Sequence, residues 1–465
     1  MDVEKKVLET LKPKREEYEL IESAYKKIAE KIEEKASSSG IQVEVTLQGS
    51  IARDTWLSGD RDLDIFVLFP LSMTLEELRA KGFSILLEAA KEIGRCELRF
   101  AEHSYVRVFL NGVEADLVPA FKVPDPGKIV SAVDRTPFHT IYINKTLTPQ
   151  DKDQVRLLKK FMKTIGVYGA ELKTKGFSGY AVELLIAKYK SFRKILEEAS
   201  NWEIPIFINT LENVDWEVFK KKLRRKYPDS VIYMPDPVDP LRNVTANVSL
   251  KTLSTFILGA RCYLNNPSID FFNAKPQPIS IDEVVEHSTD RCLVVLKYTL
   301  SDPPPPDVLW GELQRVETNA VNLLNNRDFE IIDSSTWTNE KDVAYIILEA
   351  SLCSIPEYKL YIGPRVTVRE RSESFTSKHS QNEYGPWIGK DGRLRSLRKR
   401  RTSSIVNALR ELASEYNSPP HLKPITPSVS RLNLEVAEEI VEKGGYAWLV
   451  EFVLKKPSWM AKCTG

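Results

Sequence analysis

Residues 47–70 read LQGSIARDTWLSGDRDLDIFVLFP, and this stretch decides the fold. It begins at the end of an alternating segment, residues 41–47, whose period of two predicts a half-buried strand. A Gly-Ser turn ends that strand, and residues 51–56 are expected to form a short helical turn beside it. Residues 62–69 then read DLDIFVLF, which is apolar enough to predict a central strand of a sheet.

Asp62 and Asp64 are two residues apart on this strand, so their side chains point to the same face. Two carboxylates held close together resist ionising unless a positive charge lies between them, and magnesium, which prefers oxygen ligands, suits that place. An isolated Asp-x-Asp is more often a feature of an exposed edge or a turn. Here, however, the pair opens a strongly apolar strand and follows Gly49, Ser50 and Arg53, whose backbone N–H groups, hydroxyl and guanidinium suit a phosphate chain.

A third carboxylate lies on a predicted hairpin further along the chain. Residues 105–110 and 113–118 read as strands joined by an Asn-Gly turn, and Asp116 interrupts the apolar part of the second strand. A charge on a solvated hairpin face is the alternative, but Glu114 has the same parity and fills that place. If this strand lies beside residues 62–69, three carboxylates meet. Such a group can hold two divalent ions, one activating a hydroxyl and one neutralising a leaving pyrophosphate.

The Gly-Ser turn, the arginine after it, the Asp-x-Asp pair and the later strand aspartate resemble the signature of the nucleotidyltransferase superfamily, which includes DNA polymerase beta and poly(A) polymerases. Further motifs narrow the resemblance to the archaeal, class I CCA-adding enzymes, which are tRNA nucleotidyltransferases. These motifs are residues 134–139 (DRTPFH), 155–159 (VRLLK), 167–171 (VYGAE), 175–180 (KGFSGY) and 236–243 (DPVDPLRN). They occur in order, and the resemblance continues more faintly to the C-terminus.

The resemblance and the element pattern imply a multidomain α+β protein. Residues 1–147 are expected to form a polymerase-beta-like catalytic palm, and residues 148–270 a helical central domain that completes the nucleotide pocket. Residues 271–465 are expected to form a ferredoxin-like or RRM-like body with a tail, which binds tRNA. The pattern behind this last expectation is a strand, a helix and two strands between residues 292 and 351, although no RNP aromatic signature stands out.

The activity implied by the resemblance is template-independent addition or repair of the 3′-terminal CCA of tRNA, from CTP and ATP with magnesium. Asp62, Asp64 and Asp116 would hold two metal ions, and Asp116 would lie nearest the attacking 3′-hydroxyl. Asp62 replaces the glutamate that many relatives carry. Two alternatives remain open: a poly(A) polymerase or oligoadenylate synthetase relative, and a non-catalytic RNA-binding relative that has kept the fold.

The same resemblance implies the nucleotide contacts, which are the triphosphate-gripping Ser50 and Arg53 together with His139, Lys159, Tyr168 and Arg242. His139 lies in a segment, residues 121–147, that is expected to be irregular because of its prolines, and a histidine there is by itself more often a structural hydrogen-bonder. Lys159 is a compact charge that can reach triphosphate oxygens, whereas the planar fork of Arg242 can donate two bonds to a base.

Amino-acid composition further limits the class of protein to which this chain can belong. The 465 residues allow two to four domains, and 66 Lys and Arg against 65 Asp and Glu give no global charge for nucleic acid. RNA contact must therefore come from local patches, for which residues 220–226 (KKKLRRK) and 393–401 (RLRSLRKRR) are the candidates. The five cysteines are scattered, so neither zinc nor a disulfide framework is expected. The sequence shows no signal segment and no membrane span, which favours a cytoplasmic protein; a homodimer is left open.

Overall fold

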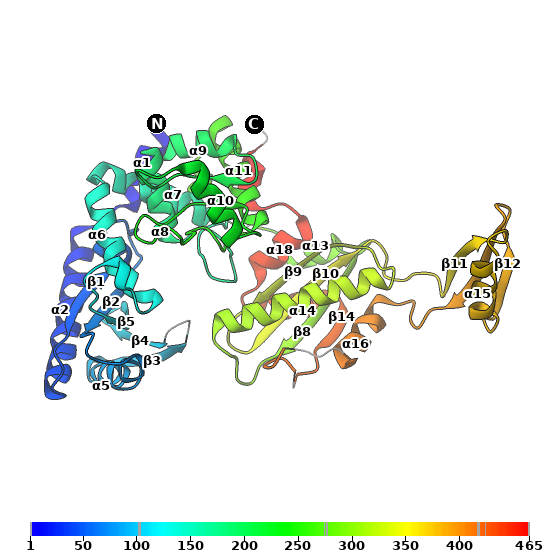
Figure 1. Cartoon of the computed structure of the whole chain (residues 1–465), viewed down its shortest axis with the longest axis horizontal. Helices are drawn as coiled ribbons and strands as arrows, with labels where there is room; N and C mark the ends of the chain where they lie inside the picture. Colours follow the sequence, from blue (N-terminus) through cyan, green and yellow to red (C-terminus); the bar gives the residue numbers. More distant parts are fainter. Residues whose placement is uncertain are drawn as a thin grey trace. The chain divides into compact units, whose positions relative to one another are not determined.

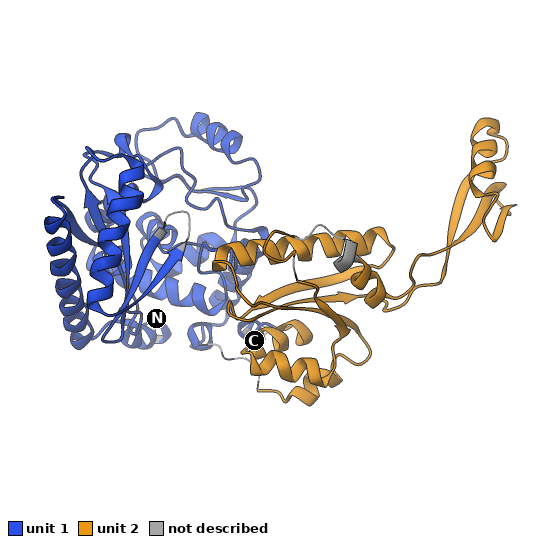
Figure 2. Ribbon diagram, turned by 90° about the horizontal axis from the view of Figure 1, so that it is seen from below, with its two compact units in different colours: residues 1–275, 457–465 blue, residues 276–456 orange. Residues whose placement is uncertain are grey.

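The computed structural model describes residues 2–100, 104–273, 275, 278–415, 419–423 and 425–463. These divide into two compact units (Figure 2). Unit 1 comprises residues 1–275 together with 457–465, and unit 2 comprises residues 276–456. Among the described residues, no helix is both long and apolar enough to cross a bilayer.

Unit 1 begins with a mixed five-stranded sheet in the order β1-β2-β5-β4-β3 (Figure 1). The central pair, β2 and β5, runs parallel, and the other neighbours are antiparallel. Asn111 and Gly112, between β4 and β5, both have positive φ, as the predicted hairpin turn requires. The strands are β1 (Glu44–Gln48), β2 (Asp62–Phe69), β3 (Arg95–Phe100), β4 (Ser104–Leu110) and β5 (Val113–Phe121).

Alternation along β2 gives the sheet two unlike faces. Leu63, Ile65, Val67 and Phe69 enter a core that also contains the apolar sides of α2 (Arg15–Ser38) and α5 (Phe83–Ile93). The residues between them, including Asp62 and Asp64, therefore point to the face that these two helices leave uncovered. The helical segment before α5 starts at α4 (Leu75–Glu77), where the Thr74 side chain accepts from Glu77 N in a capping box, and passes through a π turn, Leu78–Gly82.

The segment expected to be irregular is largely helical, so that expectation is wrong. It contains η2 (Pro126–Lys128), η3 (Ala132–Arg135) and α6 (Thr136–Thr146), and His139 lies on α6. The prolines misled because Pro137 lies in the first turn of α6, where proline's missing N–H costs nothing.

A second core of unit 1 is built by helices. The Thr148 capping box opens α7 (Pro149–Thr164), and Ser178 and Ser249 cap α8 (Gly179–Tyr189) and α11 (Leu250–Asn265). Their apolar sides pack together with those of α1 and the segment before the C-terminus. The remaining elements are α1 (Asp2–Leu11), α3 (Gly49–Ala52), α9 (Phe192–Ser200), α10 (Trp216–Lys226), α12 (Asp270–Asn273), η4 (Ser458–Lys462), and the two short strands β6 (Ile206–Phe207) and β7 (Ile232–Tyr233).

Unit 2 contains the β-α-β-β-α-β succession of a ferredoxin-like fold, which confirms the expected body. Its sheet is antiparallel, in the order β14-β8-β10-β9. In chain order the elements are β8 (Cys292–Thr299), α14 (Pro306–Asn326), β9 (Ile331–Thr338), β10 (Val343–Ala350), α16 (Ile405–Glu415) and β14 (Ser428–Arg431).

Both faces of this sheet are covered. Side chains of α14 and α16 pack on one face, and α13 (Ile281–Glu286), α17 (Leu434–Glu442) and α18 (Tyr446–Leu454) pack on the other. Val295, Tyr345 and Ile347 are buried beneath the second group of helices. An RRM reads RNA by stacking bases on an open sheet face, so this sheet is not available for that mode of binding.

A small module is inserted between β10 and α16 and is joined to them by two chain segments (Figure 2). Its three strands lie in the order β11-β13-β12, and α15 (Arg369–His379) packs against them. The strands are β11 (Tyr358–Arg365), β12 (Tyr384–Ile388) and β13 (Arg393–Lys399), so most of the basic segment of residues 393–401 forms the middle strand.

Two disulfides, Cys262–Cys463 and Cys292–Cys353, contradict the expectation that the cysteines stay unpaired. Their partners are 201 and 61 residues apart, so only the fold brings them together and no local spacing reveals them. Cys96 is the free cysteine of the described residues. Each bond lies within one unit, and Cys262–Cys463 fixes the chain's return to unit 1.

Candidate active site

The parallel register of β2 and β5 brings the strand carboxylates together. Asp64 lies opposite Asp116, and Asp62 lies opposite Glu114. Neighbouring strands are about 4.8 Å apart, and partners in this register point to the same face. The juxtaposition of Asp116 with the Asp62–Asp64 pair, inferred from strand parity, is therefore present; the role of the three residues as metal ligands stays a prediction.

This crowding shows in the proton affinities. Burial, and secondly the charge of Asp116, raise the pKa of Asp64 to about 6. Desolvation and the charge of Glu114 also raise the pKa of Asp62. The carboxylates on this face therefore repel one another, and a bound cation would reduce that repulsion.

Gly49 makes room for the Asp64 carboxylate. Its φ of +68° is in the left-handed region, and a Cβ at this position would lie 1.7 Å from Asp64 Oδ2. The Gly-Ser turn thus has a second purpose besides ending β1. It lets the backbone at the start of α3 approach the second carboxylate of β2 more closely than any side chain would allow.

Arg107 on β4 supplies a positive charge to this face. Its Nε donates to Asp116 Oδ1 at 2.6 Å and its Nη2 to Asp116 Oδ2 at 2.8 Å, while Nη1 donates to Glu114 Oε2 at 3.1 Å. Sequence reasoning missed this residue, because nothing local distinguishes an arginine that faces carboxylates from one that faces water.

The carboxylates suit a hard divalent cation, because magnesium prefers oxygen ligands and the side chains around these carboxylates supply too little positive charge to balance them. Within the described ranges, no three His, Cys, Asp or Glu side chains are already gathered as a metal-ligand set. Both oxygens of the third carboxylate, Asp116, accept from Arg107.

A cavity of about 500 Å³ opens beside the carboxylates. Asp64, Asp116, His139 and Arg242 line it, as do Tyr180 and Ser178 from the start of α8. The structure therefore brings together, around one space, residues from the predicted palm and from the predicted helical domain.

A buried aspartate that sequence reasoning did not single out, Asp236, organises one wall of this cavity. Its Oδ2 accepts from His139 Nε2 at 2.8 Å and from Arg242 Nη1 at 3.1 Å, and its Oδ1 accepts from Tyr180 OH at 2.9 Å. Burial alone would raise the pKa of Asp236, but the hydrogen bond from His139 leads the interactions that bring this pKa below its ordinary value. The His139 and Tyr180 rings stack with centroids 4.0 Å apart.

Arg53 and Lys159 belong to a second buried network. Arg53 Nε lies 2.8 Å and 3.0 Å from the two oxygens of Glu183, and Thr55 Oγ1 donates to Glu183 Oε1 at 2.5 Å. Lys159 Nζ donates to Thr55 O at 3.0 Å. Glu183 is fully buried on α8, and a lone carboxylate in the apolar run YAVELLIA was the available signal in the sequence.

Lys159 and Tyr168 converge on the start of α8. A Cβ built on Gly179 would lie 3.0 Å from the Tyr168 hydroxyl and 4.0 Å from Lys159 Nζ. Burial lowers the pKa of Lys159 to about 8 and raises the pKa of Tyr168. Ser50 lies on α3, half-buried, and its carbonyl accepts from Thr55 N at 2.9 Å, which links it to the same network.

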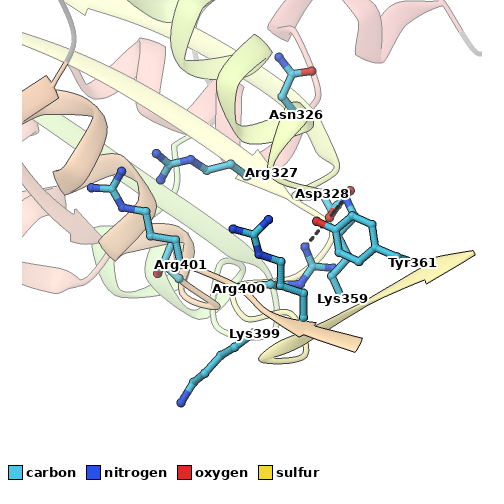
Figure 3. A pocket seen from close by; sticks show the side chains of 10 residues that line it. Asn326, Arg327, Asp328, Lys359, Tyr361, Lys399, Arg400 and Arg401 are labelled. Atoms are coloured by element: carbon cyan, nitrogen blue, oxygen red, sulfur yellow. Dashed lines mark hydrogen bonds and ion pairs between the residues drawn. The ribbon is translucent and has the colours of Figure 1, made fainter. Parts of the chain in front are cut away.

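A separate, basic cavity of about 230 Å³ lies in unit 2, where β13 ends (Figure 3). Asp328 is the acidic residue of its lining, and it forms ion pairs with Lys359 and Arg400. The lining also includes Arg327, Arg398, Lys399 and Arg401. Part of the basic segment predicted to contact RNA thus gathers around one hollow, whereas residues 220–226 lie on α10.

The sheet, the carboxylates and the adjoining cavity define a nucleotidyltransferase. Three family models match the chain: "Nucleotidyltransferase domain" over residues 25–139, "tRNA nucleotidyltransferase, second domain" over residues 153–273, and "CCA-adding enzyme, C-terminal domain" over residues 291–420.

Similar proteins of known name agree with these matches. The CCA-adding enzyme of Saccharolobus islandicus (strain M.14.25 / Kamchatka #1) is 39% identical over 86% of this chain and 89% of its own length. The CCA-adding enzyme of Saccharolobus shibatae is 36% identical over 98% of this chain and 100% of its own length. The CCA-adding enzyme of Sulfolobus acidocaldarius is 35% identical over 99% of this chain and 100% of its own length. The chain belongs to the family of CCA-adding enzymes.

Solved structures with related folds are far more distant. The Cid1 poly(U) polymerase with bound Mg 3′-dATP has a TM-score of 0.46 and 13% identity, over 58% of this chain and 96% of that one. A cytoplasmic RNA terminal U-transferase has a TM-score of 0.45 and 12% identity, over 58% of this chain and 97% of that one. Such similarity is too low to bear on the substrate.

Proposed function

We propose that this protein adds or repairs the 3′-terminal CCA of tRNA without a nucleic-acid template, using CTP and ATP and releasing pyrophosphate. The observation that carries the proposal is the alignment with CCA-adding enzymes at 35–39% identity, which reaches nearly the whole length of both chains in two relatives. The carboxylates that face the unit 1 cavity support it, because a non-catalytic RNA-binding protein has no need to crowd them.

Asp62, Asp64 and Asp116 would hold the metal, which we take to be two magnesium ions. When bound, magnesium would make the 3′-hydroxyl more acidic and neutralise the leaving pyrophosphate. Asp116 would accept the proton of the attacking hydroxyl, and Asp64 would be held against the Gly49 backbone so that its position does not drift.

The buried network around Glu183 would grip the triphosphate. Arg53 keeps Nη donors beyond the Nε that Glu183 holds, so the carboxylate orients the guanidinium without using it up. Ser50 adds a hydroxyl, and Lys159 and Tyr168 would close from α7 and the loop after it. The buried Lys159 would gain a full partner when phosphate arrives, which favours its charged form.

The side chains that Asp236 holds in place would recognise the base of the nucleotide. His139 and Arg242 both donate to this carboxylate, so their remaining edges are fixed before the nucleotide enters. Arg242 can offer two parallel donors to a base edge, which suits selection of cytosine or adenine without a template strand.

The division into a catalytic palm (1–147), a nucleotide-completing helical domain (148–270) and a tRNA-binding body with tail (271–465) stays part of the proposal. The basic cavity of unit 2 supports contact with tRNA phosphates there, since the covered sheet leaves no RRM-like surface. Because tRNA, CTP and ATP occur together in the cytoplasm, we infer that location. A homodimer stays a prediction.

The test is incorporation of radiolabelled CMP and AMP into a tRNA that lacks its 3′ end. We expect two C residues and one A, and no incorporation by the Asp64→Ala variant, which should keep its tRNA affinity. Glu44→Ala is the matched control, because Glu44 is a carboxylate of the same sheet opposite Leu68, at the other end of β2. Long A-tails, or no CMP incorporation, would reject the proposal in favour of a poly(A) polymerase or a binding protein.

A further inference from the structure

Arg107 and Asp116 form a contact that competes with the proposed metal site. They are direct partners in the antiparallel register of β4 and β5, so their side chains lie on the same face. The guanidinium donates to both oxygens of the carboxylate, at 2.6 Å and 2.8 Å. Planar, two-bond contacts of this kind are among the strongest that a carboxylate makes with a side chain.

The contact between Arg107 and Asp116 adds a positive charge to a face whose carboxylates otherwise repel one another. The registers of β2 and β5 place Asp62, Asp64, Glu114 and Asp116 on the face to which Arg107 points. A divalent ion at Asp116 would bind the same two oxygens that accept from Arg107, and the two cations would repel each other there. The guanidinium and the ion therefore compete for that carboxylate.

Arg107 also has a second place to go. Its Nη1 already donates to Glu114 Oε2 at 3.1 Å, and the Glu114 side chain is 43% exposed, so it can follow a moving guanidinium. Glu114 lies two residues before Asp116 on β5, which means that a small rotation of the Arg107 side chain exchanges one carboxylate for the other.

We propose that Arg107 is an internal counter-cation, which holds Asp116 in the metal-free enzyme and moves to Glu114 when a divalent ion binds. The proposal rests on the proposed function in taking Asp116 as a metal ligand. It assigns to Arg107 the setting of metal affinity, and to Glu114 the acceptance of the displaced guanidinium. The carboxylates are then stabilised in both states, with and without metal.

The test is binding of Mn²⁺ to the free enzyme, without nucleotide or tRNA, measured from the EPR signal of the unbound ion. Losing a charged two-bond contact favours the competing ion, so Arg107→Met should bind Mn²⁺ about tenfold more tightly than the wild type. Arg107→Lys keeps the charge but loses the planar fork, and it should also bind more tightly. Glu114→Gln should bind more weakly.

Arg99→Met is the matched control for charge, because it removes an arginine of the same sheet that pairs with Glu97 and not with the carboxylates of β2 and β5. It should leave the Mn²⁺ affinity within twofold of the wild type. Circular dichroism of each variant shows that the fold is kept, and Arg107→Lys is the conservative substitution should Arg107→Met not fold.

Three outcomes overturn the inference. Unchanged Mn²⁺ affinity in both Arg107 variants would show that the guanidinium does not compete. Tighter binding by Arg107→Met but not by Arg107→Lys would show that Arg107 affects Mn²⁺ affinity only through its positive charge and not through its two-bond contact with Asp116. Asp116→Asn separates this inference from the proposed function: if that variant binds Mn²⁺ as well as the wild type, the ligand assignment itself fails, whereas loss of binding preserves the assignment whatever Arg107 does.

Discussion

Glu183 and Arg53 form a buried ion pair across 130 residues of chain, with Arg53 Nε 2.8 Å from one carboxylate oxygen and 3.0 Å from the other. Glu183 is fully buried, so its charge is tolerated only while its partners stay in place. The pair fixes the guanidinium that we propose grips the triphosphate. It joins the residue that directly follows α3 to α8.

Removing this carboxylate should damage both stability and nucleotide binding. Breaking a buried pair costs about 3–5 kcal/mol of unfolding free energy, so Glu183→Ala should unfold at lower denaturant. Glu183→Gln keeps a hydrogen-bond acceptor and should fold, but with CTP affinity reduced about tenfold because Arg53 is held less firmly. Glu349→Gln, which weakens the Arg291–Glu349 pair of unit 2, should lower stability without changing CTP affinity. Equal CTP affinities in the wild type and Glu183→Gln would contradict the orienting role.

Gly49→Ala should abolish nucleotide addition. The new Cβ would lie 1.7 Å from Asp64 Oδ2, so the carboxylate must leave its place. Gly40→Ala is a matched control, because Gly40 has nearly the same φ, +69°, but open space around it. Both variants should lose about 1–2 kcal/mol through left-handed strain, measured by denaturant unfolding. If both also keep wild-type incorporation of CMP, the Asp64 position does not matter to the reaction.

Nucleotide affinity should fall as the pH rises through about 8. The pKa of Lys159 is lowered to about 8 by burial, so the free enzyme carries the lysine cation below that pH and loses it above. A triphosphate prefers the cation, and CTP affinity should therefore fall roughly tenfold between pH 8 and 9.5, measured by calorimetry. Lys159→Gln should bind weakly at every pH and lack this slope, whereas Lys160→Gln should behave like the wild type. The same slope in Lys159→Gln would assign the titration to another group.

Asp236→Asn should impair the choice of nucleotide more than the fold. The amide keeps the size of the side chain but cannot accept from His139, Arg242 and Tyr180 as a charged carboxylate does. Weakening hydrogen bonds to a charged group costs about 1.5–3 kcal/mol, which corresponds to about 10–100-fold in kcat/KM for CTP. Misincorporation of UMP should rise in parallel. Asp229→Asn, an exposed aspartate outside the cavity lining, is the control.

The disulfides should be detectable by counting thiols. In denaturant without reductant, an alkylating agent should label one cysteine, Cys96, and after reduction it should label five, as read by intact mass. Cys262→Ser should lower stability by about 2–5 kcal/mol, because its bond closes a long loop in the unfolded chain. Cys96→Ser should change stability little. Five labelled thiols before reduction would show that the bonds do not form.

Local pattern was sufficient for the elements that carry the proposed catalytic residues. The strand from Asp62 to Phe69 has the predicted bounds. Its eight residues alternate between polar and apolar and then become continuously apolar, which is typical of a central strand. That the strand of Asp116 lies beside this one was only a condition of the prediction, and the parallel register of β2 and β5 meets it. The capping boxes at Thr74 and Thr148 can be read from the sequence in the same way, because they depend on residues only three positions apart.

What the sequence did not reveal depends on partners far along the chain. Arg107, Glu183 and Asp236 gain their meaning from side chains that only the folded sheet and helices bring near them. The disulfides belong to the same class. The helix that carries His139 was missed for a different reason, since a proline in a first turn looks, from sequence alone, like a proline that ends a helix.

The inserted module of unit 2 enters and leaves through neighbouring residues, because Ser354 and Ser404 are bridged backbone to backbone. An insertion whose ends already touch can be exchanged or trimmed without disturbing the sheet that hosts it. Residues 358–399 can therefore be shortened or exchanged while the sheet of unit 2 folds as before.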